Sequence, residues 1–317
     1  MNEKSRLMIK VSKLYYESNL TQEVISCKLR LSRPTVSRLL RDALSTGIVK
    51  ISIAQEPGSY PEIEREIEKR FGLLEVVVTD VGDPDSHDMV SPGLGIAAAN
   101  YFSRVVQDGD IIGLTWGSTL AAMVDNLQLE KKKNVEVIQM VGGLGEPTAD
   151  THATDLVRRV SAMLGGTLRL LPAPGIVSTI ETARLLRSEP YIAQALDAVK
   201  KVNIAFVGIG APTRNSLLMR NQTIITWDEV NYIMEMGAVG EIGLQFFDQF
   251  GSLMHSDLDE RIIGINLATL SSVSRVIGIA GGSEKFKAII GAMRGHYINI
   301  LITDLRTAKG LLDVDKI

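Results

Sequence analysis

The sequence has a single cysteine, Cys27, and only four histidines in 317 residues. One cysteine excludes an internal disulfide and a cysteine-based zinc cluster. Four scattered histidines offer little for acid–base catalysis. We expect Cys27 to pack among the N-terminal helices as a small apolar side chain. The sequence therefore predicts no catalytic site, no metal centre and no cofactor.

Long apolar runs are also absent. No run reaches the roughly 18 residues that a membrane-spanning helix needs. The N-terminal residues MNEKSRLMIK are charged and lack the apolar core of a signal peptide. Hydrophobic residues make up 45% of the chain and charged residues 22%, which is typical of globular proteins. We expect a cytoplasmic protein of about two domains without a membrane partner.

The charge is unevenly distributed along the chain. Residues 1–53 contain ten Lys or Arg and four Asp or Glu, so they carry +6. The remaining residues carry −9, which gives the overall charge of −3. A basic N-terminal segment joined to an acidic remainder suggests that only the N-terminal segment binds nucleic acid.

Residues 21–47 predict two short helices joined by a tight turn. Thr21 can cap the first helix and Ser32 the second, where Pro34 occupies the first turn without losing a needed hydrogen bond. In the second helix one apolar stripe follows the helical period. It consists of Val36, Leu39, Leu40, Ala43 and Leu44.

The opposite face of the second helix is basic and hydroxylated. Arginine can bind phosphate or guanine, and serine or threonine can contact either. An amphipathic helix in a larger bundle is the alternative, but the capped pair with its tight turn favours a DNA-binding helix-turn-helix. The predicted DNA contacts are Ser32, Arg33, Thr35, Ser37, Arg38 and Arg41.

The flanking residues complete the predicted domain organisation. A helix over 4–18 would finish a three-helix core, and 48–53 alternates as a strand that could form a wing. We assign 1–54 to the helix-turn-helix domain, 55–61 to a linker containing two prolines and a glycine, and 62–317 to an effector-binding and oligomerisation domain. A helix over 61–71 could link the domains or pair with another subunit.

From residue 74 onward, continuous apolar stretches of strand length alternate with helical stretches. This pattern predicts an α/β domain, Rossmann-like, with a parallel sheet covered by helices on both faces. The predicted strands are 75–79, 111–115, 135–140, 167–171, 203–208, 276–280 and 298–303. The predicted helices are 95–106, 119–127, 151–163, 179–186, 191–199, 228–236, 284–293 and 305–312.

Ligands of such sheets bind at the carboxyl ends of the strands, so the loops there are the candidate sites. Gly117, Ser118 and Thr119 follow a strand and open a helix, which suits a phosphate cradle or a simple turn with a serine cap. The glycines Gly142 and Gly143 would allow a ligand close to the backbone, or would only form a tight turn.

Two further residues could contact a ligand. Lys285 opens a helix after a double glycine and could reach an anionic group, or could simply be solvated. Asp248 could bind sugar hydroxyls, or could be a turn residue before Gly251.

Several segments together resemble the SorC/DeoR-type family of bacterial sugar-responsive transcriptional regulators. They are LYYESNLTQEVISCKLRLSRPTVSRLL, DGDIIGLTWGSTL, VGIGAP, GAVGEIGLQFFDQFG and IAGGSEKFKAIIGAMRGHYINILITD, spanning residues 13–304 in family order.

The resemblance implies a body similar to sugar-phosphate isomerases and glucosamine-phosphate deaminases. Such a body binds a sugar, polyol or sugar phosphate, and the subunits form dimers or tetramers. By resemblance, residues 117–119, Lys285 and Arg220 fall on phosphate-site positions, and Asp248 falls on a hydroxyl-contact position. Where some members carry lysine before the double glycine, this chain has Val141, so an imine with an aldehyde cannot form there.

Two functions remain open at this point. The first is a DNA-binding regulator of a carbohydrate or polyol catabolic operon, which is controlled by binding a sugar, polyol or sugar phosphate. We expect this regulator to form a homodimer or homotetramer. The second is an isomerase- or deaminase-like enzyme with an added DNA-binding head. An enzyme would need a placed acid–base pair, and Glu241 is the one carboxylate that fits such a role. We therefore expect a regulator that binds operator DNA.

Overall fold

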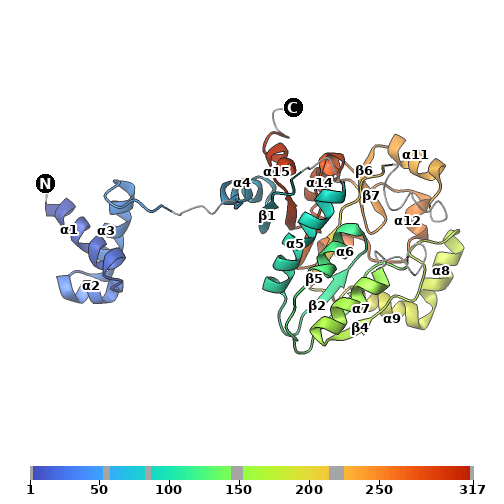
Figure 1. The fold of residues 1–317 in the computed structure, drawn as a ribbon, viewed down its shortest axis with the longest axis horizontal. Coiled ribbons are helices and arrows are strands. Elements are labelled where there is room, and N and C mark those ends of the chain that lie inside the picture. The colour runs from blue at the N-terminus through green and yellow to red at the C-terminus, as the bar shows by residue number, and fades with distance from the viewer. Residues whose placement is uncertain (1–2, 53–57, 83–86, 144–152, 214–224, 315–317) are drawn as a thin grey trace. The chain divides into compact units, whose positions relative to one another are not determined.

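The computed structural model describes residues 3–52, 58–82, 87–143, 153–213 and 225–314. Contacts between residues divide the chain into two compact units, Met1–Pro57 and Gly58–Ile317 (Figure 1). The boundary falls inside the segment 55–61, although residues 53–57 lie outside the described ranges. Each unit has its own hydrophobic core.

The N-terminal unit is a small helical bundle. It consists of α1 (Glu3–Ser12), a π-helical turn (Lys13–Glu17), α2 (Gln22–Leu29) and α3 (Arg33–Ser45). The predicted caps are confirmed, since Thr21 Oγ1 accepts a hydrogen bond from Val24 N and Ser32 Oγ accepts one from Thr35 N, both at 3.3 Å. Arg30 ends α2 with φ of 54°, a left-handed conformation that closes the turn between the helices. The core residues are Met8, Val11, Ile25, Val36, Leu39, Leu40 and Ala43.

Three expectations for this unit are wrong. Leu44 is 41% exposed, because α1 and α2 cover only one side of α3. Cys27 lies on the exposed side of α2, opposite the buried Ile25. Residues 48–52 form no strand, because the described part of this unit has no second strand to complete a hydrogen-bonded ladder.

The C-terminal unit is built on a seven-stranded parallel sheet, as its apolar pattern predicts. The strands lie in the order β1-β9-β8-β5-β2-β3-β4. Their bounds are β1 Glu75–Thr79, β2 Ile111–Leu114, β3 Glu136–Gln139, β4 Thr167–Arg169, β5 Ile204–Gly208, β8 Arg275–Ile279 and β9 Ile300–Asp304.

Helices cover both faces of this sheet (Figure 1). Successive strand residues point to opposite faces, so Phe206 packs in one apolar layer and Val207 in the other. The first layer includes α5 (His87–Val105), α6 (Ser118–Asp125) and α7 (Ala153–Leu164). The second includes α4 (Pro61–Phe71), α9 (Pro190–Val199), α11 (Trp227–Glu235), α14 (Phe286–Arg294) and α15 (Leu305–Leu312).

Most predicted elements end within a few residues of the observed ones. The largest shift is α5, which begins at His87 rather than at residue 95 and contains Pro92. The predicted helix 284–293 begins with a separate 3-10 turn, Ser283–Lys285, before α14. The helix predicted over 179–186 is α8 (Ile180–Ser188). The short helices α12 (Asp257–Arg261) and α13 (Leu267–Ser271) were not predicted.

An antiparallel hairpin was also missed by the sequence pattern. It consists of β6 (Ala238–Ile242) and β7 (Gln245–Asp248). A Cβ at Gly240 would lie 2.7 Å from both Ala288 and Phe247, so this glycine lets the hairpin pack closely on α14. The fully buried Phe247 completes that contact. Glycines at such positions weaken the strand signal in the sequence.

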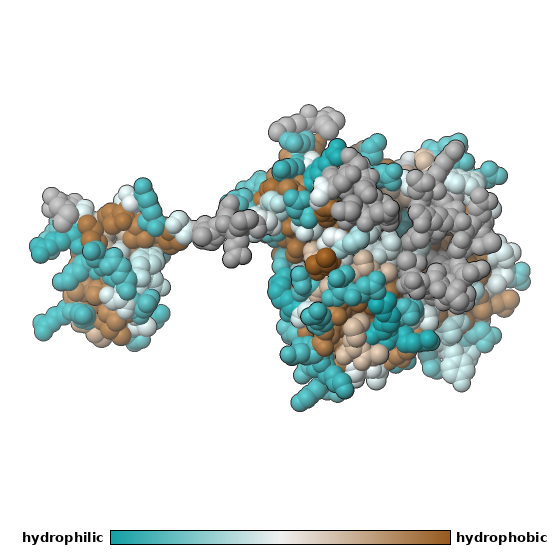
Figure 2. Space-filling view, viewed as in Figure 1, coloured by the Kyte–Doolittle hydropathy of each residue, from teal (hydrophilic) through white to brown (hydrophobic). Residues whose placement is uncertain are grey.

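Hydrophilic and apolar side chains are interspersed on the surface shown in Figure 2. Within the described residues, no helix has the length and apolar character needed to cross a membrane.

Candidate functional site

The outer face of α3 presents three arginines to solvent. Arg33, Arg38 and Arg41 are exposed, and Thr35 and Ser37 between them are partly buried. The neighbouring carboxylate is already paired, since Lys4 Nζ lies 2.9 Å from Asp42 Oδ2. The hydrogen bond from Lys4 lowers the pKa of Asp42. The arginines of α3 therefore keep their positive charge available to an anionic partner.

Ser32 has a structural role on this surface. Its Oγ caps α3 and lies 2.7 Å from Thr35 Oγ1. The cap orients the start of α3, so Ser32 positions the neighbouring Arg33 whether or not it contacts DNA itself.

A surface hollow beside Arg33 was not anticipated from the sequence. It has a volume of about 570 Å³ and lies between the π-helical turn and the starts of α2 and α3. Tyr16, Asn19 and Gln22 are among its lining residues. Hydroxyl and amide groups beside a helix N-terminus suit contact with a phosphate backbone.

The second candidate site lies where β2, β5 and β8 end. These three strands are neighbours in the sheet, so the loops that follow them lie together at its carboxyl edge. Gly208 N donates to Thr115 Oγ1 at 3.3 Å, which joins the first two loops. Gly117, with φ of 132°, leads from β2 into α6. Helix N-termini attract anions, because their first amide groups lack carbonyl partners within the helix.

The two hydroxyl groups of this cradle differ in their surroundings. Thr119 is buried, and its Oγ1 lies 3.3 Å from Ser91 Oγ in the contact between α5 and α6. Thr119 therefore contributes its backbone to the cradle rather than a free hydroxyl. Ser118 is partly exposed at the same helix start.

Glu241 enters this edge from the β6–β7 hairpin. Its backbone pairs with Gly210 through hydrogen bonds of 2.9 and 3.0 Å. The carboxylate is buried and accepts a hydrogen bond from Leu244 N at 2.8 Å. A Cβ at Gly210 would lie only 2.1 Å from Glu241 Oε1, so a larger residue there would displace the carboxyl group. The hairpin thus places a carboxyl group over the end of β5.

Lys285 is the cationic group of the same edge. It is partly buried in the 3-10 turn after β8, and its charge acts on Glu241. Burial raises the pKa of Glu241 to about 7, against the hydrogen bond from Leu244 and the charge of Lys285. Burial lowers the pKa of Lys285, while Glu241 and Glu284 oppose that shift. The two groups therefore stabilise one another's charge at this edge of the sheet.

A buried carboxylate that the sequence interpretation overlooked holds the Lys285 loop in place. Gly282 N donates to Asp304 Oδ2 at 2.7 Å. Asp304 also caps α15, because its Oδ1 accepts from Thr307 N at 2.9 Å. A Cβ at Gly281 would lie 2.4 Å from Asp304 Oδ2. Its position at the end of β9, directly before a helix, was the available signal.

Gly142 and Gly143 follow β3, which ends at this same edge beside β2. The amides of Gly142 and Gly143 donate to the carbonyls of Ile263 and Ala173, each at 2.9 Å, so neither amide is available to a ligand. A Cβ at Gly142 would lie 2.5 Å from the Ala173 carbonyl, so the protein's own backbone, and not a ligand, lies close to this glycine.

Asp248 fits the alternative of a turn residue before Gly251. Its Oδ1 accepts hydrogen bonds from Phe250 N at 2.9 Å and Ser252 N at 2.8 Å. Its carbonyl oxygen lies beside Gly291. Gly291 belongs to α14 and follows Lys285 by six residues. Arg220 lies outside the described residues.

Comparison with known proteins identifies the family. Residues 56–313 match the family model described as "Putative sugar-binding domain". The chain is 33% identical to the deoxyribonucleoside regulator of Bacillus subtilis (strain 168) over 315 residues, covering 98% of both chains. It is 30% identical to the sorbitol operon regulator of Klebsiella pneumoniae, covering 97% of this chain and 98% of the relative.

The solved structures agree with this result. The crystal structure of the full-length sorbitol operon regulator SorC from Klebsiella pneumoniae matches with a TM-score of 0.75 and 29% identity. The match covers 98% of this chain and all of the other. The similarity thus extends over the helical N-terminal unit as well as the sheet.

The raised pKa of Glu241 predicts a pH-dependent stability. Below pH 4.5 the Glu241 carboxyl is protonated in both the folded and the unfolded chain. As the pH rises from 4.5 through about 7, it ionises readily only in the unfolded chain, so the free energy of unfolding falls by about 3 kcal/mol. Glu241→Gln cannot ionise and should not show this fall. Urea titrations at several pH values measure this, with Glu284→Gln, an exposed neighbour, as the control. Parallel pH profiles for wild type and Glu241→Gln would contradict it.

Proposed function

Because the chain belongs to the SorC/DeoR-type family of sugar-binding transcriptional regulators, we propose that α3 reads operator DNA and that the carboxyl edge binds the effector. The observation that carries this proposal is the pair of separate polar surfaces, one cationic on α3 and one partly buried around Lys285. The named relatives are transcriptional regulators, which decides against the isomerase or deaminase alternative.

The operator contacts come from the start and outer face of α3. Arg33, Arg38 and Arg41 supply charge-assisted hydrogen bonds to phosphates or guanine edges, and Thr35 and Ser37 lie between them. The hollow beside Arg33 adds contacts with the backbone of the adjacent DNA strand. The caps at Thr21 and Ser32 hold both helices in the geometry that this reading needs.

The effector is a sugar, polyol or sugar phosphate held at the ends of β2, β5 and β8. Residues 117–119 offer the N-terminus of α6, and Lys285 offers a positive charge. Glu241 accepts hydrogen bonds from ligand hydroxyls when ionised and donates one when protonated. Val141 at the neighbouring strand end is fully buried and apolar, so no imine with a ligand aldehyde can form at that position.

The regulated operon serves the uptake or breakdown of such a carbohydrate. The relatives are named for deoxyribonucleosides and for the sorbitol operon, which supports this class of pathway. A cytoplasmic location follows for a protein that must meet both chromosomal DNA and a metabolite.

Assembly into a homodimer or homotetramer completes the proposal. One α3 reaches only a few base pairs, whereas two copies on half-sites spaced by whole helical turns bind far more tightly. The charged helix α4 and the outer faces of the C-terminal unit are the candidate contacts. Light scattering on the operator complex should give two or four copies, and a monomer bound at micromolar protein would contradict this.

Arg38→Ala tests the reading helix. If Arg38 contacts a base, the substitution should weaken operator binding by about 1–3 kcal/mol and leave binding to random DNA nearly unchanged. If Arg38 contacts a phosphate, both affinities should fall, and the dependence on salt should become shallower. Fluorescence anisotropy at several salt concentrations measures both, with Lys10→Ala on α1 as a control. Wild-type affinity on both DNAs would remove α3 from the interface.

Lys285→Ala tests the effector site. The variant should bind a phosphorylated effector at least about tenfold more weakly, since a charge-assisted hydrogen bond is lost, and bind the free sugar almost normally. Calorimetry with both ligand forms separates these outcomes. Lys287→Ala, an exposed lysine in the same segment, is the matched control. If Lys285→Ala and Lys287→Ala bind every ligand alike, the effector does not bind at Lys285.

A further inference from the structure

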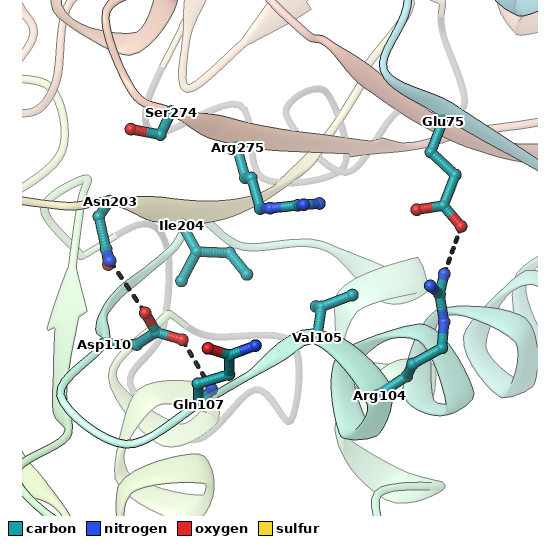
Figure 3. A pocket seen from close by; sticks show the side chains of 9 residues that line it. All are labelled: Glu75, Arg104, Val105, Gln107, Asp110, Asn203, Ile204, Ser274 and Arg275. Carbon is teal, nitrogen blue, oxygen red and sulfur yellow. Dashed lines mark hydrogen bonds and ion pairs between the residues drawn. The ribbon is translucent and has the colours of Figure 1, made fainter. Parts of the chain in front are cut away.

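A second polar pocket lies at the opposite end of the sheet. It has a volume of about 450 Å³ and is formed where strands begin rather than end (Figure 3). Glu75, Ile204 and Arg275 are the first residues of β1, β5 and β8, and Asp110 directly precedes β2. Arg104, at the end of α5, closes one side. We call this the amino-edge pocket.

One wall of the amino-edge pocket is a network around a tyrosine. Arg104 forms an ion pair with Glu75 and lies over the ring of Tyr101 at 4.7 Å from its centroid. Tyr101 Oη donates to Glu75 Oε2 at 3.2 Å. Burial raises the pKa of Tyr101 to about 12, so the hydroxyl remains a donor. The charge of Glu75 is therefore already compensated by Arg104 and Tyr101.

The other wall is built around Asp110. Its Oδ1 accepts a hydrogen bond from Asn203 Nδ2 at 2.9 Å, and its Oδ2 accepts one from Gln107 N at 2.7 Å. Asn203 Oδ1 in turn accepts from Ile111 N at 2.8 Å, which fixes the amide orientation. Each carboxylate oxygen can accept a second hydrogen bond, so Asp110 still has acceptor capacity toward the pocket.

Arg275 is the charged lining residue whose hydrogen-bonding capacity is least used. Its Nη1 donates to Tyr101 Oη at 3.4 Å, and the described residues provide no ion pair to its guanidinium within 4.0 Å. A guanidinium carries five N–H donors, so most of them are left for a ligand or water. Figure 3 shows the side chain of Arg275 extending across the pocket from β8 toward the side of Glu75.

The polar groups on the two walls indicate which class of ligand the amino-edge pocket could bind. Arg275 offers a planar fork that suits a carboxylate or a phosphate. Asp110, across the pocket, offers acceptors that suit hydroxyl groups. The volume of about 450 Å³ is in the range of small-molecule sites.

We propose that the amino-edge pocket binds a small hydroxylated organic anion, with Arg275 holding its carboxylate or phosphate and Asp110 accepting hydrogen bonds from its hydroxyl groups. This site is distinct from the one around Lys285, because it lies at the other end of the same strands. The chain would then sense a second metabolite, an acid or phosphate ester, in addition to its effector.

Calorimetry on the full chain at low ionic strength tests the proposal. The probes are D-gluconate and glycerol 3-phosphate, which carry both groups, with hexanoate as an anion that lacks hydroxyl groups. Binding of at least one of the two hydroxylated anions that persists in Lys285→Ala is expected, and it should be stronger than binding of hexanoate. Arg275→Gln should weaken it at least about tenfold. Arg158→Gln, an exposed arginine on α7, should bind as wild type does.

Two further variants make the result decisive. Arg275→Lys keeps the charge without the planar fork, so it should retain part of the affinity if the variant chains are equally folded. Lys285→Ala separates the two ends of the sheet, since anion binding at the amino edge should survive it. Binding that is lost in Lys285→Ala and kept in Arg275→Gln would overturn the proposal. Absence of binding by both hydroxylated anions at millimolar concentration would also overturn it.

Discussion

The burial of the parallel sheet on both faces is the constraint on which the C-terminal unit depends. Strands such as β9 are buried at every position and mostly apolar, and the carboxylate of β9, Asp304, lies at the strand end and is hydrogen-bonded. Polar groups that meet ligands are then confined to the ends of the strands. Lys285 and Glu241 occupy the carboxyl edge, whereas Arg275 and Asp110 occupy the amino edge. One architectural rule thus accounts for both candidate sites.

The carboxyl edge combines segments that are far apart in the chain. The loop after β2, the loop after β5, the hairpin and the turn after β8 are joined by Thr115, Gly210 and Glu241. Asp304 anchors the last of these to α15. A ligand that bridges Lys285 and the N-terminus of α6 would therefore act on the hairpin and on two helices at once. This gives a physical route by which ligand binding could alter the outer faces of the unit.

Regulation requires that the two units influence one another. The coupling free energy between ligand binding and operator binding is typically on the order of 1–3 kcal/mol. A small shift in the spacing of two DNA-binding units can change operator affinity by this amount. The units have separate hydrophobic cores, so neither needs the other to bury its apolar residues. In the proposed oligomer, signals would then be carried by the arrangement of subunits rather than by a shared core.

The sequence by itself determined the elements whose signal is local. Hydrogen-bonding caps at Thr21 and Ser32, the apolar face of α3 and the apolar strands of the sheet all depend on neighbouring residues in the chain. The tertiary structure decided what depends on contacts between distant segments. It paired Glu241 with the end of β5, committed Asp248 to its own turn, exposed Leu44 and grouped Arg275 with Tyr101. The reason is physical: helix caps and periodicity act over a few residues, whereas strand order and side-chain burial are set by packing across the whole unit.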